Sequence, residues 1–251
     1  MTTLLVIAKE PRPGRVKTRL TPPFTPRQAS ALAEAALADT LHAVAATPAT
    51  RRVLVLEGSP GPWLPPGFDV VAQCAGGLDE RLAAAFAHCA GPALLIGMDT
   101  PQVTPELLAV DFAGCDAWFG PAEDGGFWAL GLACPDPALL RGVPMSTAVT
   151  GAVQRERLVA AGLRVRDLPS LRDVDTASDA HAVAALAPRG RFAARLARCT
   201  ADGPTTAGPP PAAGPPAVEP SDVGPPPGGP SGAGPSAGPS AGPVSPTAGP
   251  R

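Results

Sequence analysis

The sequence predicts an α/β fold built on a mostly parallel sheet with helices on both faces. Short, continuously apolar runs such as residues 4–8 are typical of strands that are buried on both sides. Segments with helical periodicity separate these runs, and this alternation gives βαβ units with parallel strands. Ligands of such sheets bind outside the carboxyl ends of the strands, so a site is expected in the loops that follow the strands.

Apolar runs define the expected strands, whereas periodicity and capping residues define the expected helices. The strands are expected at residues 4–8, 52–56, 68–72, 92–96, 116–119, 127–132 and 163–165. The helices are expected at residues 26–46, 78–90, 148–161 and 177–186, with a further one that starts at Thr104-Pro105. Thr25 and Gln28 form a capping box around Pro26, and Thr176 with Asp179 caps the last helix.

The composition changes abruptly near the end of the chain. The sequence holds 35 prolines and 28 glycines, and from about residue 201 it is almost entirely Pro, Gly, Ala, Ser and Thr. Such a segment has too little apolar surface to offset the entropy lost on folding. We therefore expect a globular domain at residues 1–198 and a disordered tail at residues 199–251.

The charge and the cysteine pattern exclude several classes of protein. A net charge of −2 without a basic stripe argues against nucleic-acid binding. No apolar run is long enough to span a bilayer, and the first one ends at Lys9, too early for a signal peptide. Five cysteines without any Cys-x-x-Cys pair indicate reduced thiols, so a cytoplasmic location is expected.

The loop after the first expected strand is strongly basic. Around a single glycine, Gly14, it carries five cationic side chains, namely Lys9, Arg12, Arg15, Lys17 and Arg19. Backbone N–H groups and cationic side chains can converge there on phosphate oxygens. The alternative is a solvated loop whose charges have no ligand.

A second candidate loop follows the third expected strand. Gln73, Gly76-Gly77, Asp79 and Arg81 lie between that strand and its helix. Two glycines before a helix allow a close approach of the backbone to a ligand. Asp79 has an alternative role, because a carboxylate in the first helical turn interacts favourably with the helix dipole.

Asp99 is the most informative single residue of the sequence. It follows a short apolar strand within Gly97-Met98-Asp99-Thr100-Pro101, so its carboxylate is expected at the carboxyl edge of the sheet. Mg²⁺ takes one or two carboxylates together with substrate phosphates. The alternative is that Asp99 only caps a turn through its own backbone.

Two later loops also carry acidic residues. Asp124-Gly125-Gly126 joins two expected strands, either as a hairpin turn or as a loop whose glycines admit a base or sugar while Asp124 binds hydroxyls. Asp173 and Asp175 precede a helix, either as metal ligands or as plain capping residues.

The motifs together resemble an uncharacterised bacterial family, domain of unknown function 2064. The resemblance covers residues 1 to about 188, and it rests on Lys9-x-Pro11-x-Pro13-Gly14-x-Val16-Lys17-Thr18-Arg19-Leu20, Gly97-x-Asp99-x-Pro101, Gly120-Pro121-x-x-Asp124-Gly125-Gly126 and Asp173-Val174-Asp175-Thr176-x-x-Asp179. Members of the family are described as GT-A-type glycosyltransferases or selenodomain-associated transferases. More distantly, the pattern is similar to the molybdenum-cofactor and 2-phospholactate guanylyltransferases.

The resemblance implies a Rossmann-like GT-A fold, a three-layer sandwich of the nucleotide-diphospho-sugar transferase type, and it assigns roles to residues. Lys17 and Asp99 are expected to be catalytic, and Asp99, Asp173 and Asp175 to bind Mg²⁺ or Mn²⁺. Residues expected to bind the nucleotide or its phosphates are Ala8, Lys9, Pro13, Gly14, Lys17, Arg19, Gln73, Asp79 and Arg81. The substrate loop is expected at Asp124, Gly125 and Gly126.

This sequence departs from the family pattern at three places. The strand-end motif holds one acid, Asp99, instead of the Asp-x-Asp of many glycosyltransferases. Phe127 stands where a tyrosine is common, and Met145-Ser146-Thr147 stands where tryptophan before Ser/Gly-Thr is expected. The last two departures concern the acceptor more than the core chemistry.

The expected activity is a metal-dependent transfer from a nucleotide-activated substrate to an acceptor that the sequence does not identify. Glycosyl transfer from a nucleotide-diphosphate sugar is the leading interpretation. Nucleotidylyl transfer from a nucleoside triphosphate, with release of pyrophosphate, is the alternative, because the basic loop and the single acid favour it. A third interpretation is an inactive GT-A domain that binds a nucleotide or a protein partner, with the Pro-rich tail as a docking segment.

Overall fold

A computed structural model describes residues 1–201, and the expected tail beyond them lies outside the described residues. The strands are β1 (Thr3–Lys9), β2 (Arg51–Glu57), β3 (Asp69–Ala72), β4 (Ala93–Ile96), β5 (Ala117–Pro121), β6 (Phe127–Leu132) and β7 (Val165–Asp167). The helices are α1 (Pro26–Ala46), α2 (Leu78–Ala87), α3 (Pro105–Leu108), α4 (Thr150–Ala160), α5 (Ala177–Leu186) and α6 (Arg191–Ala201), with short 3₁₀ turns at Thr18–Leu20 and Pro137–Leu139.

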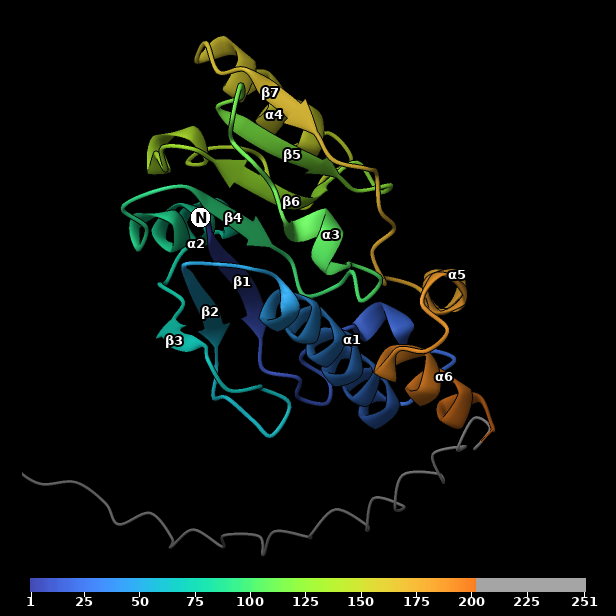
Figure 1. Cartoon of the computed structure of the whole chain (residues 1–251). Coiled ribbons are helices and arrows are strands. Elements are labelled where there is room, and N and C mark those ends of the chain that lie inside the picture. Colours follow the sequence, from blue (N-terminus) through green and yellow to red (C-terminus); the bar gives the residue numbers. More distant parts are fainter. Residues whose placement is uncertain (202–251) are drawn as a thin grey trace, which may run out of the picture. The chain divides into compact units, whose positions relative to one another are not determined.

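The strands form one sheet in the order β3-β2-β1-β4-β6-β5-β7 (Figure 1). β1 pairs in parallel with β2 and β4, β2 with β3, and β5 with β7. Only β6 runs against its neighbours β4 and β5. The predicted α/β fold with a mostly parallel sheet is therefore confirmed.

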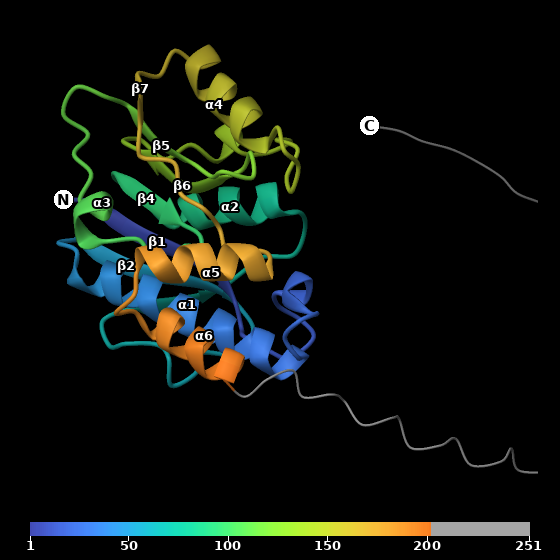
Figure 2. The same ribbon diagram turned by 90° about the vertical axis from the view of Figure 1, so that its right-hand side faces the viewer.

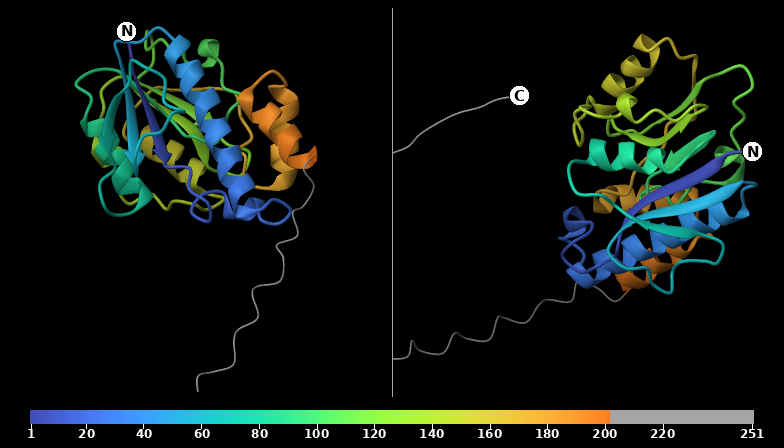
Figure 3. Two further views of the ribbon diagram at one scale, coloured as in Figure 1. Left: turned by 90° about the horizontal axis from the view of Figure 1, so that it is seen from below. Right: turned by 90° about the vertical axis from the view of Figure 1, so that its left-hand side faces the viewer.

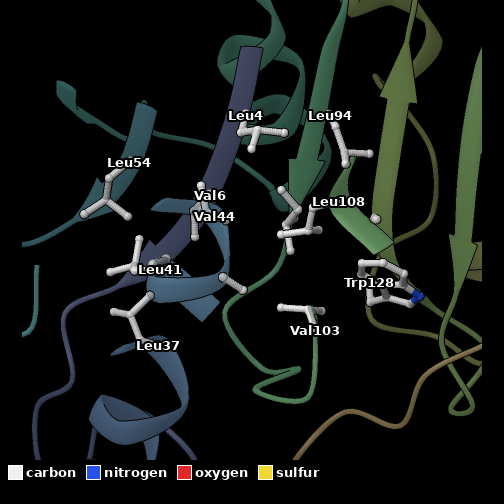
Figure 4. Close-up of a cluster of buried hydrophobic side chains, with 14 of the residues drawn as sticks. Leu4, Val6, Leu37, Leu41, Val44, Leu54, Leu94, Val103, Leu108 and Trp128 are labelled. Carbon is white, nitrogen blue, oxygen red and sulfur yellow. The ribbon is translucent and has the colours of Figure 1, made fainter. Parts of the chain in front are cut away.

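Alternate residues of β1 pack into different layers, because successive side chains of a strand point to opposite faces of the sheet. Leu4 and Val6 pack with Leu37 and Leu41 of α1 (Figure 4). Leu5 belongs instead to the cluster that includes the buried side chains of α2 and α4. The sheet is thus the middle layer of a three-layer sandwich (Figure 2).

A third apolar cluster joins α1 to α5 and α6 at the end of the described chain. Figure 3 shows these two helices, in orange, beside the blue helix α1. Phe192, Leu196 and Cys199 of α6 are buried in this cluster at the spacing of one helical face. The sequence analysis missed α6, which continues through Ala201 and so passes the boundary expected after residue 198.

A capping box explains why α1 starts at Pro26. Its capping box is complete, since the Gln28 N–H donates to the Thr25 hydroxyl and the Thr25 N–H donates to Gln28 Oε1. Together these bonds satisfy N–H groups that a helix start otherwise leaves unpaired.

No helix within residues 1–201 has the length and apolar character required to cross a membrane.

Candidate functional site

A pocket of about 540 Å³ opens at the edge of the sheet where β1 and β4 end. It is lined by ten of the residues predicted from the sequence, namely Ala8, Lys9, Arg19, Gln73, Arg81, Asp99, Asp124, Gly126, Asp173 and Asp175. A smaller cavity of about 250 Å³ is lined by Lys17 and shares Lys9, Arg19, Asp99 and Asp175 with the larger one. The loops after the strands therefore converge as the fold requires.

Lys17 lies at the centre of the charged part of this site. Its Nζ is 2.8 Å from Asp99 Oδ2 and 3.1 Å from Asp175 Oδ1, and only 8% of its side chain is exposed. Its backbone is left-handed, with φ of 51°, immediately before the 3₁₀ turn. Such a conformation is unfavourable for a residue with a Cβ, and the buried neighbours Val16 and Leu20 anchor the loop around it.

Burial and charge act on Lys17 in opposite directions. Burial by itself lowers the pKa of the ammonium group, whereas attraction by Asp99 and then by Asp175 raises it, and the net result is a pKa above the ordinary value. Lys17 is therefore a buried cation held by two carboxylates.

The segment after β7 carries Asp173 and Asp175 across the sheet to Asp99. It follows the edge of β5, and the carbonyl of Pro169 in this segment accepts a hydrogen bond from Trp128 Nε1 of β6. At its far end the Val174 N–H donates to the Asp99 carbonyl at 3.0 Å. Acidic residues that are distant in sequence thus meet at the mouth of β4.

Gln102 fastens the same two segments together, and the sequence analysis missed it. Its Nε2 donates to the Arg172 carbonyl at 2.7 Å, while its Oε1 is buried without a hydrogen-bond partner among the described residues. This buried amide joins the loop after β4 to the residue before Asp173. It therefore helps to hold Asp99 and Asp173 in position relative to each other.

Burial and the neighbouring carboxylates both raise the pKa of Asp173. Burial, followed by repulsion from Asp99 and Asp124, raises the pKa of Asp173 to about 7, an effect that Lys17 reduces and Asp175 increases. Hard oxygen donors with uncompensated negative charge fit a divalent metal. Within residues 1–201, however, no three acidic, histidine or cysteine side chains already form a metal-binding group.

Most of the predicted phosphate-binding cations already have acidic partners. Glu57, at the end of β2, contacts both Lys9 Nζ at 3.5 Å and Arg81 Nη1 at 2.7 Å. Arg12 pairs with Glu10 at 2.7 Å, and this pair lies outside the lining of the main pocket. Arg19 contacts Asp175 at 3.2 Å but leaves 77% of its side chain exposed. The surplus of positive charge expected from the sequence is therefore largely compensated.

Gln73 lines the pocket, but its amide also holds strands together. Its Nε2 donates to the Ala8 carbonyl at 2.7 Å and to the Val55 carbonyl at 3.2 Å. These bonds tie the ends of β1 and β2, so the Ala8 carbonyl already has a donor. Only the amide oxygen of Gln73, 3.5 Å from Arg81 Nη1, faces the charged groups of the pocket.

Asp79, Pro13 and Gly14 were predicted to bind phosphate but are not brought into the pocket lining. Asp79 instead accepts a hydrogen bond from the Gly142 N–H at 2.7 Å, and this bond is the main reason that its pKa is lowered. Pro13 and Gly14 form an exposed turn, in which Gly14 has φ of 73° and open space around it. The glycine is needed here for the turn conformation.

The loop Asp124-Gly125-Gly126 is a hairpin connection, and Asp124 and Gly126, but not Gly125, line the pocket. Asp124 Oδ1 accepts from the Gly126 N–H at 2.8 Å, which closes the turn. Gly125 has φ of 89°, and a Cβ there would collide with the backbone of Ala148. The Gly151 N–H donates to the Gly125 carbonyl at 2.8 Å, so Gly125 admits the start of α4.

The pocket also has lining residues that sequence reasoning did not assign. The principal ones are Leu78, Leu82, Thr100, Phe127, Trp128, Met145, Ser146, Thr147, Ala148 and Thr150. Ser146 has a positive φ of 59°, and Thr150 Oγ1 donates to the Pro144 carbonyl at 2.8 Å. Among them, Phe127 and Met145-Ser146-Thr147 are the departures from the family pattern that the sequence analysis connected with the acceptor.

Comparison with known proteins gives one family match. Residues 30–147 match the family described as "Uncharacterized protein conserved in bacteria (DUF2064)". Asp99 and the loop at Asp124 lie inside the matched range, whereas Lys17, Asp173 and Asp175 lie outside it. No curated protein matches the sequence.

Solved structures with similarity to this chain include three from different bacteria. A Desulfovibrio desulfuricans G20 protein, provisionally named a nucleotide-diphospho-sugar transferase, has 27% identity and a TM-score of 0.71 over 80% of this chain and 96% of that chain. A Mycobacterium tuberculosis H37Rv protein in complex with manganese has 22% identity and a TM-score of 0.45, over 72% of this chain and 96% of that one. The 2-C-methyl-D-erythritol 4-phosphate cytidylyltransferase of Thermus thermophilus has 15% identity and a TM-score of 0.45, over 80% and 100%.

The structural likeness and the family match both agree with the resemblance expected from the motifs. The likeness to the Desulfovibrio protein covers most of both chains. The resemblance expected from the motifs is therefore confirmed, and the family that the chain matches, over residues 30–147, is DUF2064.

Proposed function

We propose that the chain is a divalent-metal-dependent transferase that acts on a nucleotide-activated substrate. The observation that carries this proposal is the contact of Lys17 with Asp99 and Asp175 at the edge of the pocket. A phosphate–metal complex needs both a cationic donor and hard oxygen ligands, and here the two stand side by side. The likeness to the Desulfovibrio protein supports a nucleotide-diphosphate sugar as the substrate class.

The charges of the pocket support metal dependence. The pocket and the adjoining cavity hold four cationic side chains, Lys9, Lys17, Arg19 and Arg81, against four carboxylates, Asp99, Asp124, Asp173 and Asp175. A phosphate group entering such a pocket meets no net positive charge unless a further cation comes with it.

Each charged residue has a distinct proposed role. Asp99 and Asp173 hold Mg²⁺ or Mn²⁺, with Asp175 beside them. The metal would stabilise the negative charge that develops on the leaving phosphate oxygen. Lys17 and Arg19 donate hydrogen bonds to phosphate oxygens, and Asp124 accepts hydrogen bonds from substrate hydroxyls.

Glycosyl transfer is the leading reaction, and the ion pairs support it. Arg12 is paired with Glu10, and Lys9 and Arg81 share Glu57, so fewer cations are free for a third phosphate than the sequence suggests. Nucleotidylyl transfer is the second candidate, because Asp99 stands alone at the end of β4 where many glycosyltransferases have two acids.

The decisive experiment is a calorimetric titration of the protein with matched nucleoside triphosphates and nucleotide-diphosphate sugars at fixed Mg²⁺. We expect the tightest binding for a diphosphate sugar, with slow release of free nucleoside diphosphate. Tight triphosphate binding with release of pyrophosphate would establish the second candidate instead. If neither class binds with or without metal, the proposal is wrong and an inactive domain is the better interpretation.

Gln102→Leu is expected to weaken metal-dependent nucleotide binding without contacting the nucleotide. The change removes the hydrogen bond to the Arg172 carbonyl and leaves that carbonyl unpaired, which costs about 1–3 kcal/mol of stability. Asp173 and Asp175 lose their tether to the loop that carries Asp99. The measurement is urea unfolding together with nucleotide titration in Mg²⁺.

Gln154→Leu is the matched control. Gln154 is fully buried, its Nε2 donates to the Leu139 carbonyl at 2.9 Å, and its Oε1 likewise has no partner within the described chain. Both variants should lose stability, but only Gln102→Leu should lose affinity at equal folded fraction. Equal affinities in the two variants would show that Gln102 has only a general structural role.

A further inference from the structure

Lys17 contacts the carboxylate of Asp99, to which the proposed function assigns a divalent metal. Its Nζ is 2.8 Å from Asp99 Oδ2, and Asp99 makes no other ion pair among residues 1–201. Nζ also contacts Asp175 Oδ1 at 3.1 Å, so the ammonium bridges the two carboxylates. The ammonium therefore neutralises Asp99, one of the two carboxylates that the proposed function assigns to the metal, together with Asp175 beside it.

The ammonium competes with a metal for Asp99. Mg²⁺ binds carboxylate oxygen at about 2.1 Å and keeps several other ligands around itself. A lysine Nζ in hydrogen-bond contact with the same oxygen occupies part of that coordination sphere and repels the metal strongly at such a short distance.

We propose, on the basis of the proposed function, that Lys17 is an internal counterion that closes the metal site until a phosphate group draws its ammonium away from Asp99. The metal then binds with the nucleotide and not before it. The two ligands are consequently coupled, each raising the affinity for the other by the same factor.

The surroundings of Lys17 suit such an exchange. A lysine side chain has four rotatable bonds, so Nζ can move several ångströms while the backbone stays in place. Arg19 also contacts Asp175, at 3.2 Å, and remains as its partner when Lys17 leaves. Asp99 and Asp173 then have no ion-pair partner among residues 1–201 and are open to a metal.

The test is a titration with Mn²⁺ alone, without nucleotide, in wild-type protein and in Lys17→Met. We expect the variant to bind Mn²⁺ at least about tenfold more tightly, because the competing cation is gone. Nucleotide affinity should change in the opposite direction, since the same side chain contacts phosphate. A variant that binds Mn²⁺ no better than wild type would overturn the proposal.

Lys9→Met is the matched control, because Lys9 lines the same pocket but pairs with Glu57 and not with Asp99. Its Mn²⁺ affinity should equal that of wild type. An equal gain in both variants would mean that overall charge, and not the position of Lys17, sets the affinity, and the proposal would fail.

A crystal of wild-type protein soaked in Mn²⁺ alone needs no variant and keeps the proposal testable if Lys17→Met does not fold. We expect Lys17 still in contact with Asp99 and no anomalous peak on that carboxylate. A peak on Asp99 in the absence of nucleotide contradicts the proposal. Failure of the proposed function has a different signature, since there no nucleotide binds to any variant, whatever happens to Mn²⁺.

Discussion

Asp99→Asn is expected to abolish the stabilisation of the protein by nucleotide with Mg²⁺ while leaving the metal-free protein folded. The substitution keeps the shape of the side chain but removes the charge that a hard cation requires. Loss of a metal ligand should weaken metal-dependent nucleotide binding by at least about 100-fold, more than the loss of an outer-shell partner does. The Asp99 side chain is 36% exposed and lies on a loop, so the core is not disturbed.

The measurement is the shift in melting temperature caused by nucleotide and Mg²⁺, compared with the shift caused by nucleotide in EDTA. Asp79→Asn is the control, because Asp79 was also predicted to bind phosphate but lies outside the pocket lining. That variant should keep the full shift. If Asp99→Asn keeps it as well, Asp99 only caps its turn and the proposed metal site is wrong.

Most strands and helices could be predicted because each depends on a sequence pattern among neighbouring residues. The apolar run of β1, the capping box at Thr25 and Gln28, and the alternation of strands with helices all depend on near neighbours in sequence. α6 was missed although Phe192, Leu196 and Cys199 have helical spacing. Its apolar face is short, and the surface that buries it belongs to α1 and α5, which the local pattern does not contain.

The site was predictable to the extent that it follows from strand ends. Asp99 and Lys9 lie at the pocket because parallel strands bring their carboxyl ends to one edge. The pairing of Lys17 with Asp175, 158 residues later, depends on how the segment after β7 crosses the sheet, and no local pattern encodes that path. The compensation of Lys9 and Arg81 by Glu57 was missed for the same reason.

Gly125 lies in a hairpin turn, one of the two interpretations drawn from the sequence, and the structure adds a further reason for a glycine there. The atoms nearest to a Cβ at this position belong to the backbone of Ala148. Gly151 also approaches closely, since a Cβ there would collide with the Gly126 carbonyl. The loop at Asp124 and the start of α4 are therefore packed backbone to backbone.

Gly125→Ala is expected to destabilise the protein by about 2–5 kcal/mol, the sum of a left-handed backbone conformation and a forced separation of packed segments. Gly14→Ala isolates the first contribution, because Gly14 has φ of 73° with no atom within 4 Å of a Cβ, and it should cost about 1–2 kcal/mol or less. Urea unfolding of both variants measures the difference. Since Ala148 and Thr150 line the pocket, Gly125→Ala should also weaken nucleotide binding in the fraction that remains folded. Equal losses of stability in the two variants would mean that the close approach of Ala148 to Gly125 does not contribute to the free energy of unfolding. Other contacts would then hold this wall of the pocket in place.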